Sequence, residues 1–397
     1  MPDRFPTVDE ASNVELVAYH DLEGRPAFKL ALHRSGHAWY LYLGHHWHSG
    51  CTILEVTDPA HPRFVRFIEG PPGARTSQVQ AAGNLLVTGV ERPVYGEETE
   101  WDPDSGGALL WDLTDDPADP RLVGHYRSGG DGTHRNFYAG GPHLFAAVRR
   151  HGIEQGGYLA VVDVSAPAAP REIGRFGDEP GSQFFHGPAY VVGDRAYCSF
   201  GDMVVLDVSD RTAPRLVSTV DFGAFGGMIG CHSAVPFPAR QLVVANGEPH
   251  AEGQNTSLNF VAIVDVSDEE HPRILGACPV PRPERSAPYE SYQAKGGRFG
   301  PHNQHHHQGH PDLWEPQSML AVTYFSAGLR IYTIEDPCYP EEIGWFVPGP
   351  PAIRHGPRPR GMLVSHFEDV LVDRRGNIFC TDSNHGLFVL RSVAPLS

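Results

Sequence analysis

One recurring phrase constrains the fold of this chain more than any other feature. An apolar run that ends near Asp or Thr is followed by a proline-bearing turn, and a second Pro then opens another short apolar run. A strand-end Asp or Ser hydrogen-bonds the turn backbone, and Pro presets φ for the turn, so the phrase predicts a strand–turn–strand unit. The copies are ILEVTDPAHPRFV (53–65), LLWDLTDDPADPRLV (109–123), AVVDVSAPAAPREI (160–173), VVLDVSDRTAPRLV (204–217), AIVDVSDEEHPRIL (262–275), RIYTIEDPCYPEEI (330–343) and a shorter LFVLRSVAP (387–395).

The spacing of the copies predicts an all-β fold, a seven-bladed β-propeller formed by residues 1–397 as one domain. Roughly 44 to 68 residues separate successive copies, which is the length of a four-strand blade with loops. The last unit supplies three strands, so we expect the strand at 13–22 to complete it and to close the ring without an open sheet edge. The expected blades are 26–70, 76–128, 133–178, 185–222, 231–280, 301–348 and 365–393.

The repeat also resembles a known family. The segments VAIVDVSD (261–268), LAVVDVSA (159–166) and MVVLDVSD (203–210) are similar to the namesake phrase of the LVIVD-repeat β-propellers. The resemblance covers nearly the whole chain and implies the propeller fold. It implies little about activity, because propellers carry many unrelated functions.

Composition excludes several classes of function. The formal net charge is −17, with 31 Lys and Arg against 48 Asp and Glu, so a nucleic-acid partner is not expected. No apolar run approaches the length of a membrane-spanning helix. The N-terminus lacks the pattern of a secretory signal, and the six cysteines lack paired spacing, so we expect a cytoplasmic protein with reduced thiols.

Histidines recur at one place in the predicted topology, the start of the innermost strand of a blade. Five consecutive blades carry one there, in GTHRNF, FFHGPAY, GGMIGCHSAV, GGRFGPHNQH and VSHFEDV: His134, His186, His232, His302 and His366. The shared pattern of Gly226, Gly227 and Gly230 before His232 fixes the register of His302. His305, His306 and His307 are its alternatives.

Inner strands converge on the channel, so these imidazoles are predicted to hold one transition-metal ion, with four of the five as ligands. Iron(II) is favoured; zinc, manganese and copper are the alternatives. Structural histidines around a hydrated channel are the competing interpretation. In architecture alone, the arrangement is similar to that of carotenoid-cleavage-type oxygenases and of the methanethiol oxidases in the selenium-binding family, none of whose sequence motifs occurs here.

Further polar residues are expected at the same end of the channel. Glu368 lies two residues after His366 on the same side of its strand, so it is a candidate base or partner for a ligand imidazole, and His305 is a second candidate catalytic group. Loops that reach this end supply candidate substrate contacts: His46, His48, Glu248 and His385.

The predicted function is that of a metal-dependent enzyme, a non-haem iron oxidoreductase or dioxygenase that acts on a small, partly apolar molecule. A metal-dependent hydrolase or lyase and a non-catalytic, partner-binding propeller are the alternatives. The acidic exterior favours a neutral or cationic substrate unless local cations such as Arg25 and Arg298 reverse the field. The oligomeric state is left open.

Overall fold

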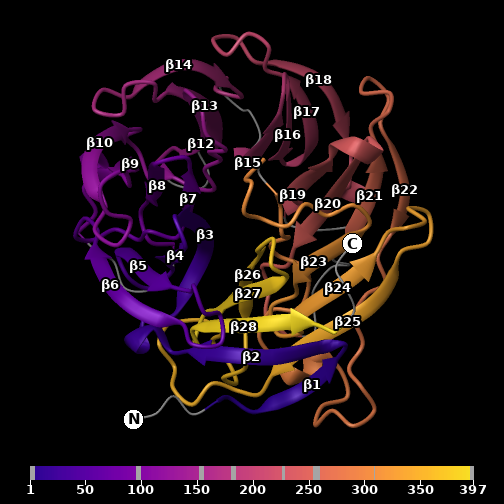
Figure 1. Cartoon of the computed structure of the whole chain (residues 1–397). Coiled ribbons are helices and arrows are strands. Elements are labelled where there is room, and N and C mark those ends of the chain that lie inside the picture. Colours follow the sequence, from indigo (N-terminus) through magenta and orange to yellow (C-terminus); the bar gives the residue numbers. More distant parts are fainter. Residues whose placement is uncertain are drawn as a thin grey trace.

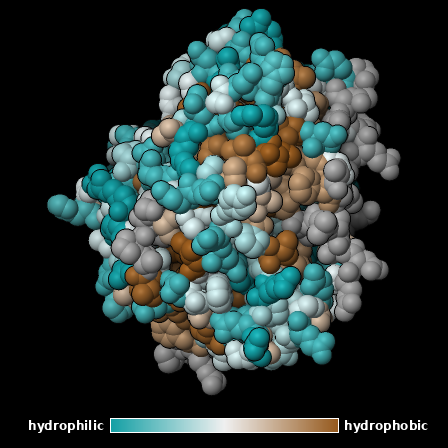
Figure 2. Space-filling view, turned by 90° about the vertical axis from the view of Figure 1, so that its right-hand side faces the viewer, coloured by the Kyte–Doolittle hydropathy of each residue, from teal (hydrophilic) through white to brown (hydrophobic). Residues whose placement is uncertain are grey.

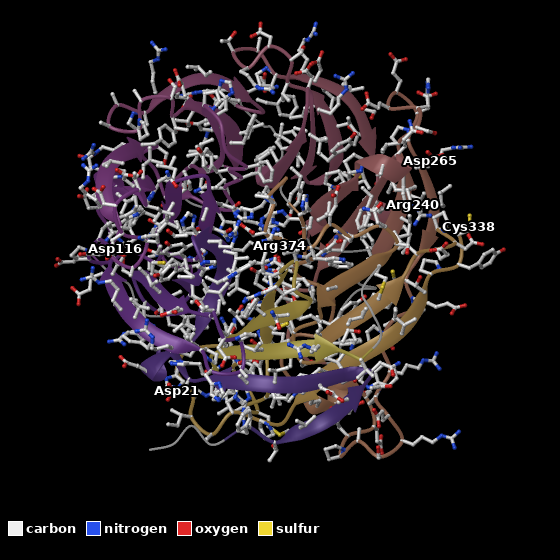
Figure 3. The ribbon with its side chains drawn as sticks, in the orientation of Figure 1. Asp21, Asp116, Arg240, Asp265, Cys338 and Arg374 are labelled. Carbon is white, nitrogen blue, oxygen red and sulfur yellow. The ribbon has the colours of Figure 1, made fainter. Side chains whose placement is uncertain are left out.

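The repeated phrase forms the two outer strands of a blade and the turn between them. In the blade of residues 229–277, the N–H of Ser267 donates to Oδ1 of Asp265 (2.9 Å), and Arg273 donates to Oδ2 of the same Asp (2.7 Å). Asp207 makes the same two contacts with Ser209 and Arg215. The strand-end Asp thus fixes the turn, as expected, and also holds the Arg that follows the Pro in these two copies. Figure 3 shows these turns at the rim, where Asp116, Asp265 and Cys338 are labelled.

Seven four-stranded antiparallel sheets surround a central axis, which confirms the seven-bladed propeller (Figure 1). The computed structural model describes residues 5–94, 100–151, 156–179, 185–225, 229–253, 260–307 and 309–393. Blades 1 to 3 consist of β3 (Ala27–Ser35), β4 (Ala38–His45), β5 (Gly50–Glu55) and β6 (Arg63–Glu69); β7 (Val79–Ala82), β8 (Leu85–Val90), β9 (Gly107–Asp112) and β10 (Arg121–Arg127); and β11 (Gly132–Thr133), β12 (His143–Arg149), β13 (Gly157–Asp163) and β14 (Arg171–Phe176). Blades 4 and 5 consist of β15 (Phe185–Val192), β16 (Arg195–Phe200), β17 (Asp202–Asp207) and β18 (Arg215–Val220); and β19 (Ile229–Phe237), β20 (Leu242–Glu248), β21 (Val261–Asp265) and β22 (Arg273–Ala277).

The N-terminus completes two blades. Blade 7 consists of β26 (Phe367–Val372), β27 (Asn377–Asp382) and β28 (Leu387–Ser392), and β2 (Val14–His20) pairs with β28, which confirms the predicted closure. Blade 6 consists of β23 (Met319–Thr323), β24 (Leu329–Thr333) and β25 (Glu341–Pro348), and β1 (Val8–Ser12) pairs with β25. The sequence did not predict β1. The chain therefore ties its first residues to both of its last blades.

Two inner strands are irregular, and both carry histidines. In blade 6, residues 299–306 run along β23: the N–H of His302 donates to the carbonyl of Thr323 (2.8 Å), and the N–H of His305 donates to that of Ala321 (2.9 Å). In blade 3 the N–H of His134 donates to the carbonyl of Ala147 (2.7 Å). Short hydrogen-bonded stretches thus hold these segments at the axis.

The core lies between neighbouring blades. Leu85, Val87 and Leu110 of blade 2, for example, pack with Leu144 and Val148 of blade 3. All six cysteines are free, and five are buried. In the described residues the helical elements are short: η1 (Leu22–Gly24), η2 (Pro103–Ser105), η4 (Gly223–Phe225), η5 (Pro238–Arg240) and α1 (Tyr292–Lys295).

The outer surface is mixed in character. On the side that carries β22 and β25, hydrophilic residues surround smaller hydrophobic groups (Figure 2). Ile274, Val280 and Tyr339 are among the exposed apolar residues. Within the part of the chain that the structure describes, no helix has the length and apolar character needed to cross a membrane.

Candidate metal centre

The five aligned histidines lie close together around the axis, and we call them the histidine arc. His186 and His232 belong to β15 and β19, His134 follows β11, and His366 directly precedes β26. Ring centroids are 5.1 Å apart from His134 to His186, 4.9 Å from His186 to His232, and 4.8 Å from His232 to His302. Phe325 stacks between His302 and His366, 4.5 Å from each. The blade topology therefore brings all five predicted side chains together. Gly226 and Gly227, which served to align them, lie outside the described residues.

Four members of the arc have their Nδ1 atoms held by the surrounding protein. His232 Nδ1 lies 3.0 Å from the carbonyl of His302, and His302 Nδ1 lies 2.7 Å from the carbonyl of Glu368. His134 Nδ1 lies 2.9 Å from a carboxylate oxygen of Glu91. His366 Nδ1 lies 2.9 Å from a carboxylate oxygen of Glu368. Such contacts fix the tautomer of an imidazole and orient its Nε2 atom, as they do in metal-binding histidines. His366 differs, because its Nε2 atom already accepts from the N–H of Arg298 at 3.4 Å.

Glu248, at the end of β20, brings a carboxylate to the arc. Its Oε2 atom lies 3.5 Å from His232 Nε2, and its Oε1 atom lies 3.8 Å from His302 Nε2. Donor atoms of His186, His232 and Glu248 all lie within 4.8 Å of one another, and among the described residues these three form the one such group of potential metal ligands. Two donors bound to one ion at about 2.1 Å each lie about 3 to 4 Å apart, so the His232–Glu248 distance fits a shared ion.

The protonation states suit metal binding. Burial lowers the pKa of His186 and of His232 well below its usual range, and the nearby Arg135 guanidinium lowers it further. Burial also lowers the pKa of His302, to about 4. Burial alone would raise the pKa of Glu248, but the neighbouring His250, His232 and Arg298 outweigh it and hold this pKa well below its usual range. Neutral imidazoles and an ionised carboxylate are the forms that bind metals.

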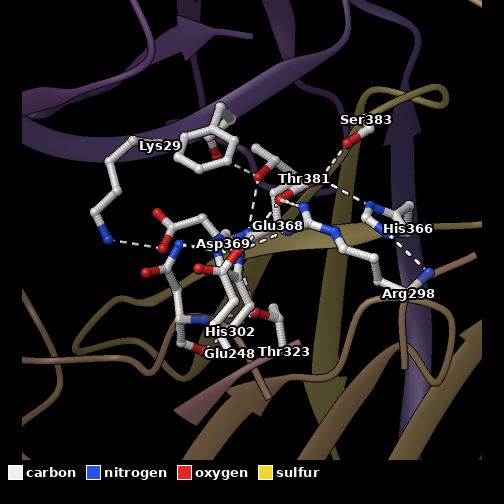
Figure 4. A network of polar contacts seen from close by, with 12 residues as sticks. Lys29, Glu248, Arg298, His302, Thr323, His366, Glu368, Asp369, Thr381 and Ser383 are labelled. Atoms are coloured by element: carbon white, nitrogen blue, oxygen red, sulfur yellow. Dashed lines mark hydrogen bonds and ion pairs between the residues drawn. The ribbon is translucent and has the colours of Figure 1, made fainter. Parts of the chain in front are cut away.

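Glu368 supports the arc rather than facing it as a free base (Figure 4). Its Oε1 atom accepts from His366 Nδ1 and from the hydroxyl of Ser383, and its Oε2 atom lies 3.3 Å from His302 Nδ1. Burial would raise the pKa of Glu368, but the contacts with His366, His302 and Arg298 hold it well below its usual range. Because Glu368 is such a weak base, it is poorly suited to accept a proton. Its contacts instead favour a role in orienting the imidazoles of His302 and His366.

Blades 1 and 2 complete the circle with other residue types. Phe28 of β3 lies 5.5 Å from the ring of His302 and meets His46 edge-on at 4.6 Å. In blade 2, Arg75 and Ser77 both contact the buried carboxylate of Glu91. Of the predicted substrate contacts, Glu248 and His46 are thus beside the arc.

Three predicted site residues, His305, His385 and His48, make their described contacts outside the arc. Both ring nitrogens of His305 are occupied, one by the carbonyl of Trp314 (2.8 Å) and the other by the N–H of Val372 (3.1 Å), so His305 holds two segments together instead of moving protons. His385 contacts the carbonyl of Gly349 (3.0 Å). His48 packs edge-on against His45, 5.9 Å away. None of these described contacts reaches the arc.

Arg135 is a central residue that the sequence did not single out. Its guanidinium donates to the carbonyls of Gly187 (2.8 Å) and His232, to the hydroxyl of Ser233 (2.8 Å) and to the side chain of Asn303 (3.1 Å). One side chain from blade 3 thus links blades 4, 5 and 6 at the axis. Its place directly after His134 was the available signal.

Comparison with known proteins supports the repeat and the fold. A family model described as the LVIVD repeat matches residues 154–178 and 190–222. These two segments carry LVIVD repeats. The matched residues span parts of blades 3 and 4, where two copies of the phrase were recognised from sequence. No curated protein sequence matches the chain.

Solved propellers share the architecture of these LVIVD repeats at low sequence identity. The periplasmic gluconolactonase PpgL of Pseudomonas aeruginosa is 13% identical, with a TM-score of 0.54 over 86% of this chain and 90% of that one. Sqt1 of Saccharomyces cerevisiae is 10% identical, with a TM-score of 0.53 over 97% of this chain and 100% of that one. The propeller domain of Cps50 (Swd1) from Myceliophteria thermophila is 11% identical, with a TM-score of 0.54 over 93% and 98%. These likenesses show the fold alone.

Proposed function

We propose that this protein is a metal-dependent enzyme in which His186, His232 and Glu248 hold one transition-metal ion at the end of the propeller channel. The observation that carries the proposal is the convergence of two buried imidazoles and one buried carboxylate within 4.8 Å. Two further imidazoles approach Glu248: His250 Nε2 lies 3.3 Å from its Oε2 atom, and His302 Nε2 lies 3.8 Å from its Oε1 atom. This set replaces the all-histidine shell expected from sequence.

Iron(II) is the favoured ion, and an oxidoreductase of the non-haem iron, dioxygenase type is the favoured activity. Two histidines and one carboxylate with open positions are typical of oxygen-activating iron sites. The chain itself contributes orientation: the carbonyl of His302 holds Nδ1 of His232 at 3.0 Å, and Arg298 donates to Glu248 at 2.7 Å. Glu368 in turn holds His302 and His366. Phe28 and Phe325 supply apolar surface beside the arc, which suits a small, partly apolar substrate.

The test is the metal content of untagged protein loaded with iron(II) without oxygen and then desalted. We expect close to one ion per wild-type chain and most of it lost in His232→Ala, because that change removes one of three ligands. His271→Ala is the matched control, since His271 lies in an exposed turn and contacts Asp268. Equal iron retention in both variants would contradict the assignment.

Oxygen consumption then separates the activities. Turnover that requires oxygen supports the oxidoreductase, whereas tighter binding of zinc and oxygen-independent turnover favour a hydrolase or lyase, because zinc also uses two histidines and a glutamate. A protein that retains no metal favours a partner-binding propeller.

A further inference from the structure

Arg75 is a buried cation with unused hydrogen-bonding capacity. The residue is 4% exposed, and its Nε atom lies 3.0 Å from Oε1 of Glu91 without hydrogen-bond geometry. Among the described residues, Glu91 is its one side-chain partner, and no hydrogen bond reaches its guanidinium nitrogens. A guanidinium offers five donors in a planar fork that matches a carboxylate.

Glu91 is also too heavily shared to neutralise Arg75. Its carboxylate accepts from Ser77 Oγ (2.6 Å), from His134 Nδ1 (2.9 Å) and from Arg149 (3.0 Å). Two buried guanidiniums, those of Arg75 and Arg149, therefore share one carboxylate, which leaves one positive charge in excess. A buried charge without a counter-ion costs considerable free energy, so this cluster favours an additional anion.

The cluster belongs to the same ring of side chains as the arc. Isolated β-bridges pair Arg75 with Glu91 and Glu91 with Gly132. They connect blade 2 to β11, the short strand directly before His134. Burial lowers the pKa of His134 and of His46, and the charge of Arg75 contributes to both shifts, which agrees with a place between these two imidazoles. Where blades 3 to 7 supply histidines, blade 2 thus supplies a guanidinium.

Aromatic rings lead from His46 toward the arc. His46 stacks on Trp47 with ring centroids 4.6 Å apart and meets Phe28 at 4.6 Å, and Phe28 leads on to His302 at 5.5 Å. A ligand that bridges from Arg75 toward the arc would pass along these rings. A ligand with an anionic group at one end and an apolar or aromatic body would fit this series of contacts.

We propose that Arg75 binds the carboxylate of a small organic anion whose apolar body lies against Phe28 and His46. As an assignment of substrate class, the proposal rests on the proposed function; as a binding site, it does not need the metal. It replaces the neutral or cationic substrate expected from the net charge, because the buried guanidiniums reverse the field of the acidic exterior at this place.

The test uses benzoate as the probe and benzamide as its neutral isostere, titrated calorimetrically into the full-length protein in metal-loaded and metal-stripped forms. We expect wild type to bind benzoate about ten-fold or more tightly than benzamide in both forms, as charge-assisted bonding to a guanidinium predicts. Arg75→Gln should abolish the preference, and Arg75→Lys, which keeps the charge but loses the fork, should reduce it.

Arg273→Gln is the control, because Arg273 is exposed and contacts Asp265 at the rim. The proposal is overturned if wild type shows no preference for benzoate, or if Arg75→Gln, with wild-type iron content as evidence of its fold, keeps that preference. An Arg75-dependent preference in a protein that retains no metal would contradict the proposed function and support the anion site. Iron binding without a preference for benzoate would support the proposed function and contradict the anion site.

Discussion

Buried neutral histidines make the fold sensitive to acid, and His45 and His305 are examples outside the arc. His45 bonds to the carbonyl of Pro26 and to the hydroxyl of Thr52, and burial lowers its pKa to about 3. Burial lowers the pKa of His305 to about 3 as well. An unfolded histidine titrates near pH 6.5. Below that pH the unfolded chain binds protons that the folded chain does not, so stability falls as the pH falls toward 3.

We expect the free energy of unfolding to drop by about 2 kcal/mol or more between pH 7 and 5.5, since each such histidine contributes up to about 1.4 kcal/mol per pH unit. Urea denaturation at the two pH values measures this. His45→Gln should weaken the pH dependence by about one histidine's share, whereas His271→Gln, at an exposed turn, should not. A stability that is constant from pH 7 to 5.5 would contradict the burial of neutral imidazoles.

At this scale the sequence predicted the histidines well and their partners poorly. His134, His186, His232, His302 and His366 could be aligned because each stands at the start of an inner strand. Arg75, Glu91 and Glu248 could not be assigned their contacts, because those depend on which side chains of neighbouring blades meet at the axis. The contacts of His305 could not be foreseen either, since three successive histidines look alike in sequence until the structure shows which ring is already hydrogen-bonded.

Strand β1 acts as a latch on the segment that leads into blade 6. Its Glu10 is 2% exposed and accepts hydrogen bonds from the hydroxyls of Tyr289 and Tyr292 and from the N–H of Glu284 (2.6 Å). The chain then continues through α1 to Arg298, which fixes Glu248. The N-terminus therefore holds in place the segment that leads to Arg298 at the candidate site.

Replacing Glu10 by Ala should lower the free energy of unfolding by about 3 kcal/mol, because buried donors lose their shared acceptor. Glu15→Ala in β2 is the control, since Glu15 is exposed and such changes usually stay within about 0.5 kcal/mol. Urea denaturation of both variants at pH 7 gives the comparison. Similar losses in the two variants would show that Glu10 does not act as a latch.

The pairing of β1 with β25 was invisible in the sequence for a physical reason. Residues 8–12, VDEAS, lack the apolar alternation that marks a strand, and the buried residue among them is a glutamate. Strand β2 was predictable, because the repeat left its last unit one strand short.

For the whole molecule, ring closure is what creates the candidate site. Seven blades from distant parts of the chain each place an inner strand at one axis, and the side chains at their starts meet there although they are far apart in sequence. Repeat spacing sufficed to predict this architecture. The residue types in the ring divide the site into the proposed metal-binding part in blades 4 and 5 and a cationic part in blades 2 and 3.

The most direct test of the metal centre is anomalous X-ray diffraction from crystals of the iron-loaded protein, recorded on both sides of the iron absorption edge. We predict one iron peak per chain, about 2.0 to 2.3 Å from a ring nitrogen of His186, a ring nitrogen of His232 and a carboxylate oxygen of Glu248. An iron peak away from these three residues, or none within the arc, would contradict the account.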